Sequence, residues 1–217
     1  MSAPQIKRPD LPEYMTWEEL ERLPEEIAEQ IELWNGRVVW VRRGPAEHQR
    51  FIRRLTNEFE LSSRKDMSTQ TEHCWDVELE CNVFLGATGK SDFVTPDFLV
   101  YHCLSGPYQD IRAANVVLVG EVLSPSNTQT DMDAKKARYA DAGIPWYWEV
   151  RLAHDESAID TVRAFGLQTG YTHLPDDVRP LHPDEYRVVG EWTRADTDGI
   201  HFDHPFPISI PWSDLEF

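Results

Sequence analysis

Long apolar runs are absent from this chain. No stretch of about 18 consecutive apolar residues, the length that a membrane-spanning helix needs, occurs in its 217 residues. Residues 1–10 (MSAPQIKRPD) also lack the apolar segment of a secretory signal. We therefore expect no membrane partner and a cytoplasmic location.

Cysteine is scarce as well. The three cysteines, Cys74, Cys81 and Cys103, are an odd number and form no CxxC pair. This pattern argues against a disulfide framework or a zinc site built on paired cysteines. We expect reduced thiols, as in a cytoplasmic protein.

Positive charge is the third shortage. Lys and Arg number 21 against 38 Asp and Glu, which gives a net charge of −17. Proteins bind nucleic acid largely by neutralising phosphates with Lys and Arg, so this balance weakens the case for a general nucleic-acid binder. Residues 37–65 are the exception, with eight basic and three acidic residues. A polyanion would have to contact that segment.

Length and composition are those of an ordinary globular protein. The chain is 41% hydrophobic and 27% charged, which suits one domain with a sizeable core. We expect a single domain over residues 1–217, with residues 1–14, which are polar and rich in proline, as an irregular lead-in.

Local patterns predict the elements. Thr16 and Glu19 form a capping box that opens a short helix ending near Pro24. Asn35-Gly36 predicts a hairpin with a type I′ turn, and Glu32 lies on its first strand. The other expected elements are a helix over 46–62, a helix over 131–142 capped by Thr130, strands over 73–85, 94–101, 116–123 and 146–150, a hairpin formed by 158–165 and 169–174, and peripheral strands at 187–189 and 206–210.

Two of the apolar strands each carry one carboxylate. Asp97 lies within residues 94–101, and Glu121 lies within residues 116–123. An ionised carboxylate is costly to bury without a partner, and two on neighbouring strands repel each other. A divalent cation is the usual remedy, and Mg²⁺ suits such a pair because it needs few protein oxygens and keeps several waters.

Lys135 could complete a hydrolytic site. It is four residues after Asp131 and four before Tyr139, so the three share one helix face. Phosphodiester hydrolysis needs an activated water and stabilised negative charge, which carboxylate-held cations and a lysine can supply. On spacing alone, an ordinary Asp131–Lys135 helix pair with Tyr139 packed below it is the preferred interpretation.

A longer pattern resembles a known family. It consists of Pro96-Asp97, Glu121-Val-Leu-Ser-Pro-Ser126, Asp131, Lys135, Tyr139, Ala142-Gly-Ile144 and Tyr147-Trp148, with Trp17-Glu-Glu-Leu20, Glu32, Asn35-Gly36 and His48 upstream. This signature is similar to that of the Uma-two family, restriction-endonuclease-like proteins of the PD-(D/E)XK nuclease superfamily. The resemblance covers roughly residues 14–215.

The resemblance implies an α/β (α+β) fold, with a mixed central sheet flanked by helices and additional N-terminal and C-terminal hairpins. It implies a metal-dependent endodeoxyribonuclease that acts on DNA, and a homodimer, because double-strand cleavage needs two sites. Asp97 and Glu121 would be catalytic ligands of Mg²⁺ or Mn²⁺, with the carbonyl of Val122 as a third ligand. Leu123 stands where the superfamily has its lysine, and Lys135 would replace that lysine. The alternative is a catalytically degenerate nuclease fold that acts as a binding or regulatory module.

Further candidates each have a simpler explanation. Glu32 is either an acidic residue of the pocket or a surface carboxylate of the hairpin. His48 is either a partner of a carboxylate or a histidine bonded to backbone at the start of a helix. Three basic residues of the same helix, either phosphate contacts or a solvated face, are Arg50, Arg53 and Arg54.

Overall fold

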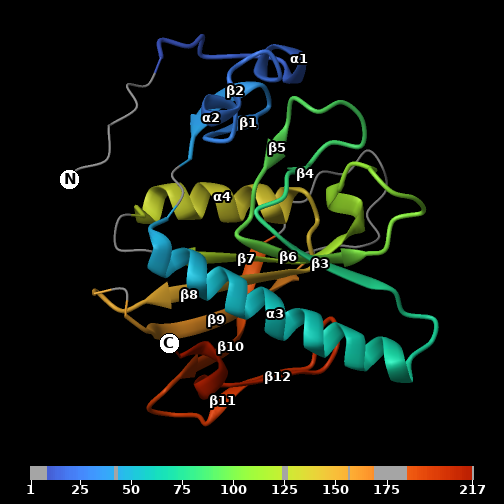
Figure 1. Cartoon of the computed structure of the whole chain (residues 1–217), viewed down its shortest axis with the longest axis vertical. Coiled ribbons are helices and arrows are strands. Elements are labelled where there is room, and N and C mark those ends of the chain that lie inside the picture. Colours follow the sequence, from blue (N-terminus) through green and yellow to red (C-terminus); the bar gives the residue numbers. More distant parts are fainter. Residues whose placement is uncertain (1–8, 42–43, 124–126, 156, 169–184, 217) are drawn as a thin grey trace.

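The computed structural model describes residues 9–41, 44–123, 127–155, 157–168 and 185–216. A six-stranded sheet forms the centre, with α3 on one side and α4 on the other (Figure 1). The helices are α1 (Trp17–Leu20), α2 (Glu25–Ala28), α3 (Ala46–Thr69) and α4 (Gln129–Asp141), and the 3-10 helices are η1 (Ala113–Asn115) and η2 (Trp212–Leu215). The strands are β1 (Ile31–Trp34), β2 (Arg37–Trp40), β3 (Trp75–Leu79), β4 (Val83–Phe84), β5 (Phe93–Val94), β6 (Phe98–His102), β7 (Val116–Leu123), β8 (Trp146–Leu152), β9 (Ile159–Gln168), β10 (Glu185–Thr193), β11 (Gly199–Phe202) and β12 (Ile208–Pro211).

The central sheet is mixed, as expected. Its strand order is β10-β9-β8-β7-β6-β3. Strands β7 and β8 are parallel, whereas the other neighbouring pairs are antiparallel. The parallel pair needs a crossover connection, and α4 supplies it between β7 and β8.

The two faces of the sheet carry separate cores because side chains alternate along a strand. On β6, Phe98 and Val100 pack with the buried residues of α3, and Leu99 and Tyr101 pack with those of α4. On β7, Val119 belongs to the α4 core. Residues two apart on a strand share a face, so the sequence position of Glu121 directs its side chain towards α4.

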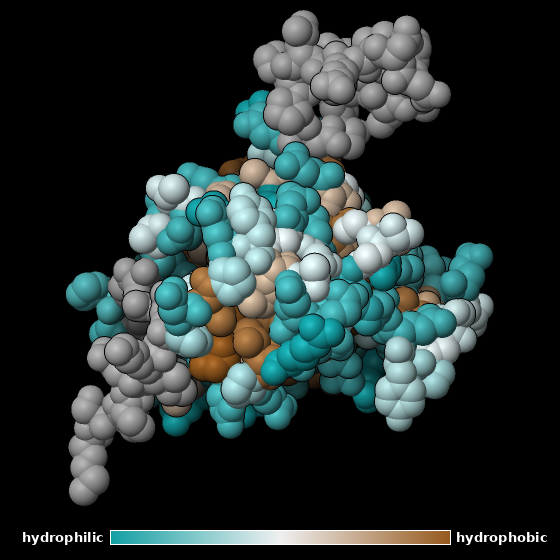
Figure 2. All heavy atoms as spheres, turned by 90° about the horizontal axis from the view of Figure 1, so that it is seen from above, coloured by the Kyte–Doolittle hydropathy of each residue, from teal (hydrophilic) through white to brown (hydrophobic). Residues whose placement is uncertain are grey.

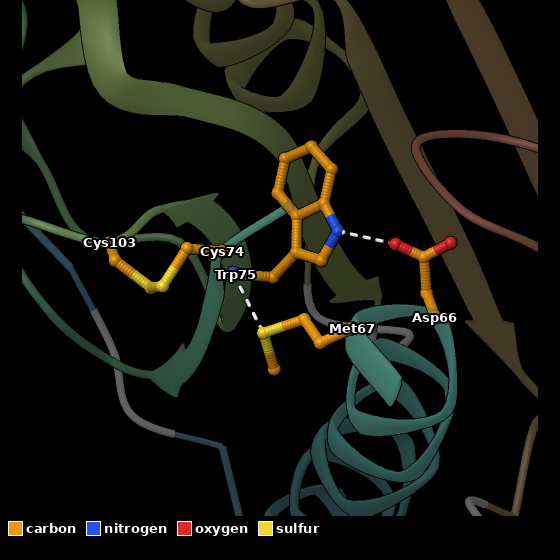
Figure 3. Close-up of a disulfide and its surroundings, with 5 residues drawn as sticks. All are labelled: Asp66, Met67, Cys74, Trp75 and Cys103. Carbon is orange, nitrogen blue, oxygen red and sulfur yellow. Dashed lines mark hydrogen bonds between the residues drawn. A yellow bond between two sulfur atoms is a disulfide. The ribbon is translucent and has the colours of Figure 1, made fainter. Parts of the chain in front are cut away.

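Helix α3 is longer than predicted, since it continues past Ser62 to Thr69. Its last turns are mainly polar, which hides them from a search for an apolar stripe. Asp66 anchors this end: its Oδ2 accepts hydrogen bonds from Trp75 Nε1 at 2.8 Å and contacts His73 Nδ1 at 2.7 Å. Met67 Sδ accepts from the Trp75 amide, so the end of α3 is fixed to the start of β3 (Figure 3).

The expectation of three reduced thiols is wrong. Cys74 and Cys103 form a disulfide, with their Cα atoms 5.3 Å apart, and Cys81 is free. Both bonded residues adjoin the register pair Trp75↔His102, at the end where β3 meets β6 (Figure 3). They are 29 residues apart in sequence, and only strand pairing brings them within bonding distance.

The N-terminal region confirms two local predictions. Thr16 and Glu19 form the capping box, and the β1–β2 hairpin turns at Asn35 and Gly36 with φ of +51° and +81°. Positive φ at both central residues is the signature of a type I′ turn. Helix α2, which follows Pro24, was not predicted.

The predicted strand over residues 94–101 is two strands in different sheets. β5 belongs to a small sheet of order β2-β1-β5-β4, and β6 belongs to the central sheet. Pro96 lies in the break, where its missing N–H removes a ladder donor. The break brings the N-terminal hairpin against the central sheet and leaves Asp97 at the junction.

Other boundaries also differ from the predictions. Thr128, rather than Thr130, caps α4, and its hydroxyl accepts from the Asp131 amide. The predicted strand over 73–85 divides into β3 and β4, and β9 continues through Gly166 to pair with β10. Residues 169–174, the other half of the predicted hairpin, lie outside the described residues. The β11–β12 pair is the expected C-terminal hairpin.

Figure 2 shows the hydropathy of one face of the molecule. Hydrophilic residues cover most of the face drawn in Figure 2, with a smaller apolar area near its centre. Within the described residues, no helix combines the length and apolar character needed to cross a membrane.

Candidate functional site

Asp97 and Glu121 lie side by side at one end of the β6–β7 pair. The register pairs Phe98 with Gly120, so the next step outward places Asp97 opposite Glu121. Gly120 allows this close pairing: a Cβ at that position would lie 2.0 Å from the ring of Phe98. The two strand carboxylates singled out in the sequence are therefore neighbours.

Asp97 and His48 hold the backbone of Val122 from two sides. Asp97 Oδ2 accepts a hydrogen bond from the Val122 amide at 2.6 Å. His48 Nε2 lies 2.6 Å from the Val122 carbonyl oxygen, and a carbonyl only accepts, so Nε2 carries the proton. Nε2 is also 3.6 Å from Asp97 Oδ2. His48 does bond a backbone carbonyl, but that carbonyl belongs to the predicted metal-ligand residue.

Lys135 reaches the carboxylates from α4. Its Nζ lies 2.8 Å from Glu121 Oε1 and 3.1 Å from Glu32 Oε1. It also donates to the Thr95 carbonyl oxygen at 3.1 Å. All three donors of the ammonium group thus have acceptors, and the lysine bridges the central sheet and the N-terminal hairpin.

Glu32 is a buried member of this group rather than a surface carboxylate. Its relative exposure is 0%. Its Oε1 accepts from the Thr95 amide at 2.9 Å, and its Oε2 accepts from Trp34 Nε1 at 2.8 Å. These bonds, together with Lys135, satisfy both oxygens, so Glu32 acts as a fixed anchor for the lysine.

Tyr139 packs beneath Glu121. Its hydroxyl donates to Glu121 Oε1 at 2.5 Å. Burial, followed by the negative charge of Glu121, raises the pKa of Tyr139 well above its usual value. The hydroxyl therefore stays protonated and serves as a fixed donor. We call Glu32, Thr95, Asp97, Glu121, Lys135 and Tyr139 the Lys135 cluster.

Burial sets the charge state of the two strand carboxylates. It raises the pKa of Asp97 to about 7 and that of Glu121 to about 7, although the charge of Lys135 acts in the opposite direction on both. The same carboxylates raise the pKa of Lys135, so it remains charged. One lysine does not fully compensate three carboxylates, and the cluster favours an additional proton or cation.

The carboxylate oxygens of Asp97 and Glu121 suit a cation that keeps much of its water. Among the described residues, none donates a hydrogen bond to Asp97 Oδ1 or Glu121 Oε2, while the other oxygen of each carboxylate is bonded. Two carboxylate oxygens match the small number of protein ligands that Mg²⁺ takes. Over the described ranges, no group of three or more His, Cys, Asp or Glu side chains is arranged to hold a metal. The residues therefore fit a hydrated Mg²⁺ better than a closed metal cage.

Most of the predicted residues meet here, but some do not. Asp131 is exposed at the start of α4, where it bonds Thr128, so the Asp131–Lys135 helix pair is not formed. Arg54 donates to the Asp214 carbonyl oxygen near the C-terminus. The role of the three arginines of α3 in phosphate contact stays a prediction.

The sequence did not reveal Thr95, a member of the cluster, or Trp34, which donates to Glu32. Trp34 lies two residues after Glu32, and this spacing puts both on one face of β1 and could have suggested the contact. Thr95 contributes mainly through its backbone, which no residue pattern encodes.

Comparison with known proteins agrees with this geometry. The model of the Uma2 family, described as "Putative restriction endonuclease", matches residues 17–172. The chain belongs to the Uma2 family. That span includes every member of the Lys135 cluster and confirms the resemblance seen in the sequence.

A solved structure shares the fold. It is a crystal structure described as "a putative nuclease belonging to DUF820" from Anabaena variabilis, with a TM-score of 0.56 and 17% sequence identity. The alignment covers 93% of this chain and 97% of that chain. This Uma2 protein therefore has the restriction-endonuclease-like fold over nearly its whole length. No curated protein matches the sequence.

Proposed function

We propose that this Uma2 protein is a metal-dependent endodeoxyribonuclease. The observation that carries the proposal is the position of Lys135, whose ammonium lies 2.8 Å from Glu121 although it comes from a different element. An acidic pair that can hold a divalent cation, together with an adjacent lysine, can supply the activated water and the charge stabilisation that phosphodiester hydrolysis needs. Here it is assembled from β7, α4 and the residue preceding β6.

The residues would divide the work as follows. Asp97 and Glu121 would hold Mg²⁺ or Mn²⁺, with the Val122 carbonyl as a further ligand. The bound ion supplies Lewis-acid stabilisation of the phosphoryl oxygens and a more acidic water. Lys135 orients the attacking water or stabilises negative charge, and Glu32 fixes its position.

The displaced lysine is compatible with this chemistry. Leu123 occupies the position at which the superfamily pattern has lysine, and it follows Glu121 by two residues. A helix above the same strand end can present an ammonium to the same carboxylate, because Lys has a long flexible stem. The contacts of Lys135 with Glu121 and Glu32 support this replacement.

Substrate and assembly belong to the same proposal. DNA would meet the chain near residues 37–65, where basic residues exceed acidic ones, and cleavage would weaken steeply as salt rises. We propose a homodimer, because cutting both strands of a duplex needs two sites.

The test is cleavage of plasmid and single-stranded DNA at low salt, with Mg²⁺, with Mn²⁺ or with a chelator. The parent should cut only with metal. Asp97→Asn and Lys135→Met should abolish cutting, whereas Asp133→Asn, which changes an exposed carboxylate of α4, should not. Cutting by the parent in chelator, or by Asp97→Asn at the parental rate, would contradict the mechanism.

A second candidate is a non-catalytic nuclease fold that binds or regulates. Lys135 favours it, because the lysine already lies between Glu121 and Glu32 and partly neutralises them without metal. Under this alternative the parent would not cut, and Asp97→Asn would stabilise the fold by removing like-charge repulsion. Thermal unfolding of both proteins with and without Mg²⁺ separates the candidates.

A further inference from the structure

A second, open group of acidic side chains lies at the edge of the central sheet. A cavity of about 310 Å³ is lined there by Asp76 and Glu78 of β3, Tyr101 of β6, Cys81, Leu104 and Tyr108. We call it the acidic pocket. Asp76 pairs in register with Tyr101, and Glu78 is two residues further along β3, so these three side chains share one face of the sheet.

Two carboxylates give the pocket negative charge, and the described residues supply no cationic side chain to its lining. None of the described residues that line it is Lys, Arg or His. In the described part of the chain, neither Asp76 nor Glu78 makes an ion pair or a side-chain hydrogen bond. Burial, then the charge of Asp76, raises the pKa of Glu78, as expected for neighbouring carboxylates that lack a cation.

Tyr101 gives an independent indication of a ligand. The residue as a whole is 7% exposed and lines the cavity. Among the described residues, no side chain or backbone group forms a hydrogen bond with its hydroxyl, which is not one of the fully buried polar atoms. Burial raises the pKa of Tyr101 to about 12, and Asp76, Glu78 and Cys81 act on it in the same direction. The hydroxyl therefore lies near these groups, stays protonated, and presents an unused acceptor and donor to the cavity.

Size and lining restrict the class of ligand. The cavity would hold roughly ten waters, at about 30 Å³ each, which is far more space than a bare metal ion needs. Leu104 and the ring of Tyr101 add apolar surface, and the exposed ring of Tyr108 offers a face to a cation at the rim. Phosphates would be repelled, so nucleic acid does not fit.

We propose that the acidic pocket binds an organic cation, a guanidinium or primary ammonium group on a short apolar stem. The head group would bond Asp76, Glu78 and the Tyr101 hydroxyl, and the stem would lie against Leu104. Such a group could come from a free amine or from an arginine or lysine side chain of a protein.

Calorimetric titration of the full chain at low salt tests this. Agmatine should saturate one site, and butylurea, which lacks both charged groups of agmatine, should not bind. The double variant Asp76→Asn/Glu78→Gln should weaken agmatine binding roughly tenfold or more, because it removes charge-assisted hydrogen bonds. The matched double variant Glu25→Gln/Glu26→Gln, which removes two exposed charges on α2, should leave it unchanged.

Tyr101→Phe adds a finer test. It should weaken agmatine several-fold but leave tetramethylammonium, which has no N–H to donate, unaffected. N-acetyl-arginine amide distinguishes the sources: binding equal to agmatine indicates a protein side chain, and weaker binding indicates a free amine. Equal losses in both double variants, or no saturable binding by any cation, would overturn the proposal. Circular dichroism and the unfolding midpoint confirm that each variant is folded.

Discussion

The Lys135 cluster and the acidic pocket are two groups of carboxylates that both include residues of the central sheet, and their negative charge is compensated in opposite ways. In the cluster, Lys135 contacts Glu121 and Glu32 directly, and backbone amides bond Glu32 and Asp97. In the pocket, Asp76 and Glu78 have no such partner among the described residues. The cluster is closed and buried, and the pocket is open to solvent.

The difference shows what a buried carboxylate needs. Removing an ion from water costs several kcal/mol, and Glu32 is tolerated at 0% exposure because every oxygen is bonded. Asp76 and Glu78 are exposed, so their charged forms lose less hydration on folding and no neighbouring lysine is required. The cluster therefore depends on its own residues for stability, whereas the pocket is available to a cation from outside.

The largest expected effect on stability comes from removing the lysine of the Lys135 cluster. Lys135→Met should lower the free energy of unfolding by about 3–5 kcal/mol, because it leaves buried carboxylates without their cation. Urea denaturation measures the loss. Lys136→Met is the control and should cost less, since its Nζ is 3.8 Å from Glu149. Equal stability of Lys135→Met and the parent would mean that the ion pairs contribute little.

Near the acidic pocket, the Cys74–Cys103 disulfide, rather than an ion pair, should contribute most to the stability of the fold. Reducing the Cys74–Cys103 disulfide should lower the free energy of unfolding by about 3 kcal/mol, mainly through the unfolded chain's gain in entropy. Denaturation with and without reductant measures this. Thiol titration of the unfolded, unreduced protein should find one free thiol, Cys81. Three free thiols would restore the expectation from the sequence.

The Lys135 cluster should also make the stability of the fold depend on pH. In chelator, the raised pKa values of Asp97 and Glu121, both to about 7, mean that the folded state holds protons that the unfolded state releases. Stability is then greatest near pH 4 and falls as pH rises to about 7, by about 2 kcal/mol or more. Thermal unfolding across this range tests it. Asp97→Asn should flatten the slope, and a slope that rises with pH would contradict the assignment.

The smallest effect should have the opposite sign. Asp76→Asn should stabilise the protein by about 0.5 kcal/mol, because it removes repulsion from Glu78 on the same strand face. The exposed Glu72, with no carboxylate at a comparable spacing on a strand, is the matched position, and Glu72→Gln should change stability less. Loss of stability in Asp76→Asn would indicate an interaction that the pocket geometry does not include.

Much of this architecture could be predicted locally. The capping box at Thr16, the type I′ turn at Asn35-Gly36 and the strand carrying Glu121 all follow from short-range preferences, and all three are present. The end of α3 could not be predicted, because Asp66 is fixed by Trp75 and His73 after the helix has ended. The break in the strand before Asp97 was missed because apolar residues on both sides of Pro96 gave one continuous pattern.

Residue type and periodicity in the sequence indicated the apolar strands that carry Asp97 and Glu121. The mixed sheet with its flanking helices, and Lys135 as a member of the site, came from the resemblance to the Uma2 family, which rests on a long pattern of residues along the chain. Three contacts could be found only in the folded molecule: Glu32 buried against Lys135, His48 bonded to the Val122 carbonyl, and the disulfide between Cys74 and Cys103. Each of these contacts joins elements far apart in sequence, and strand pairing and helix docking, rather than any local preference, set their distances.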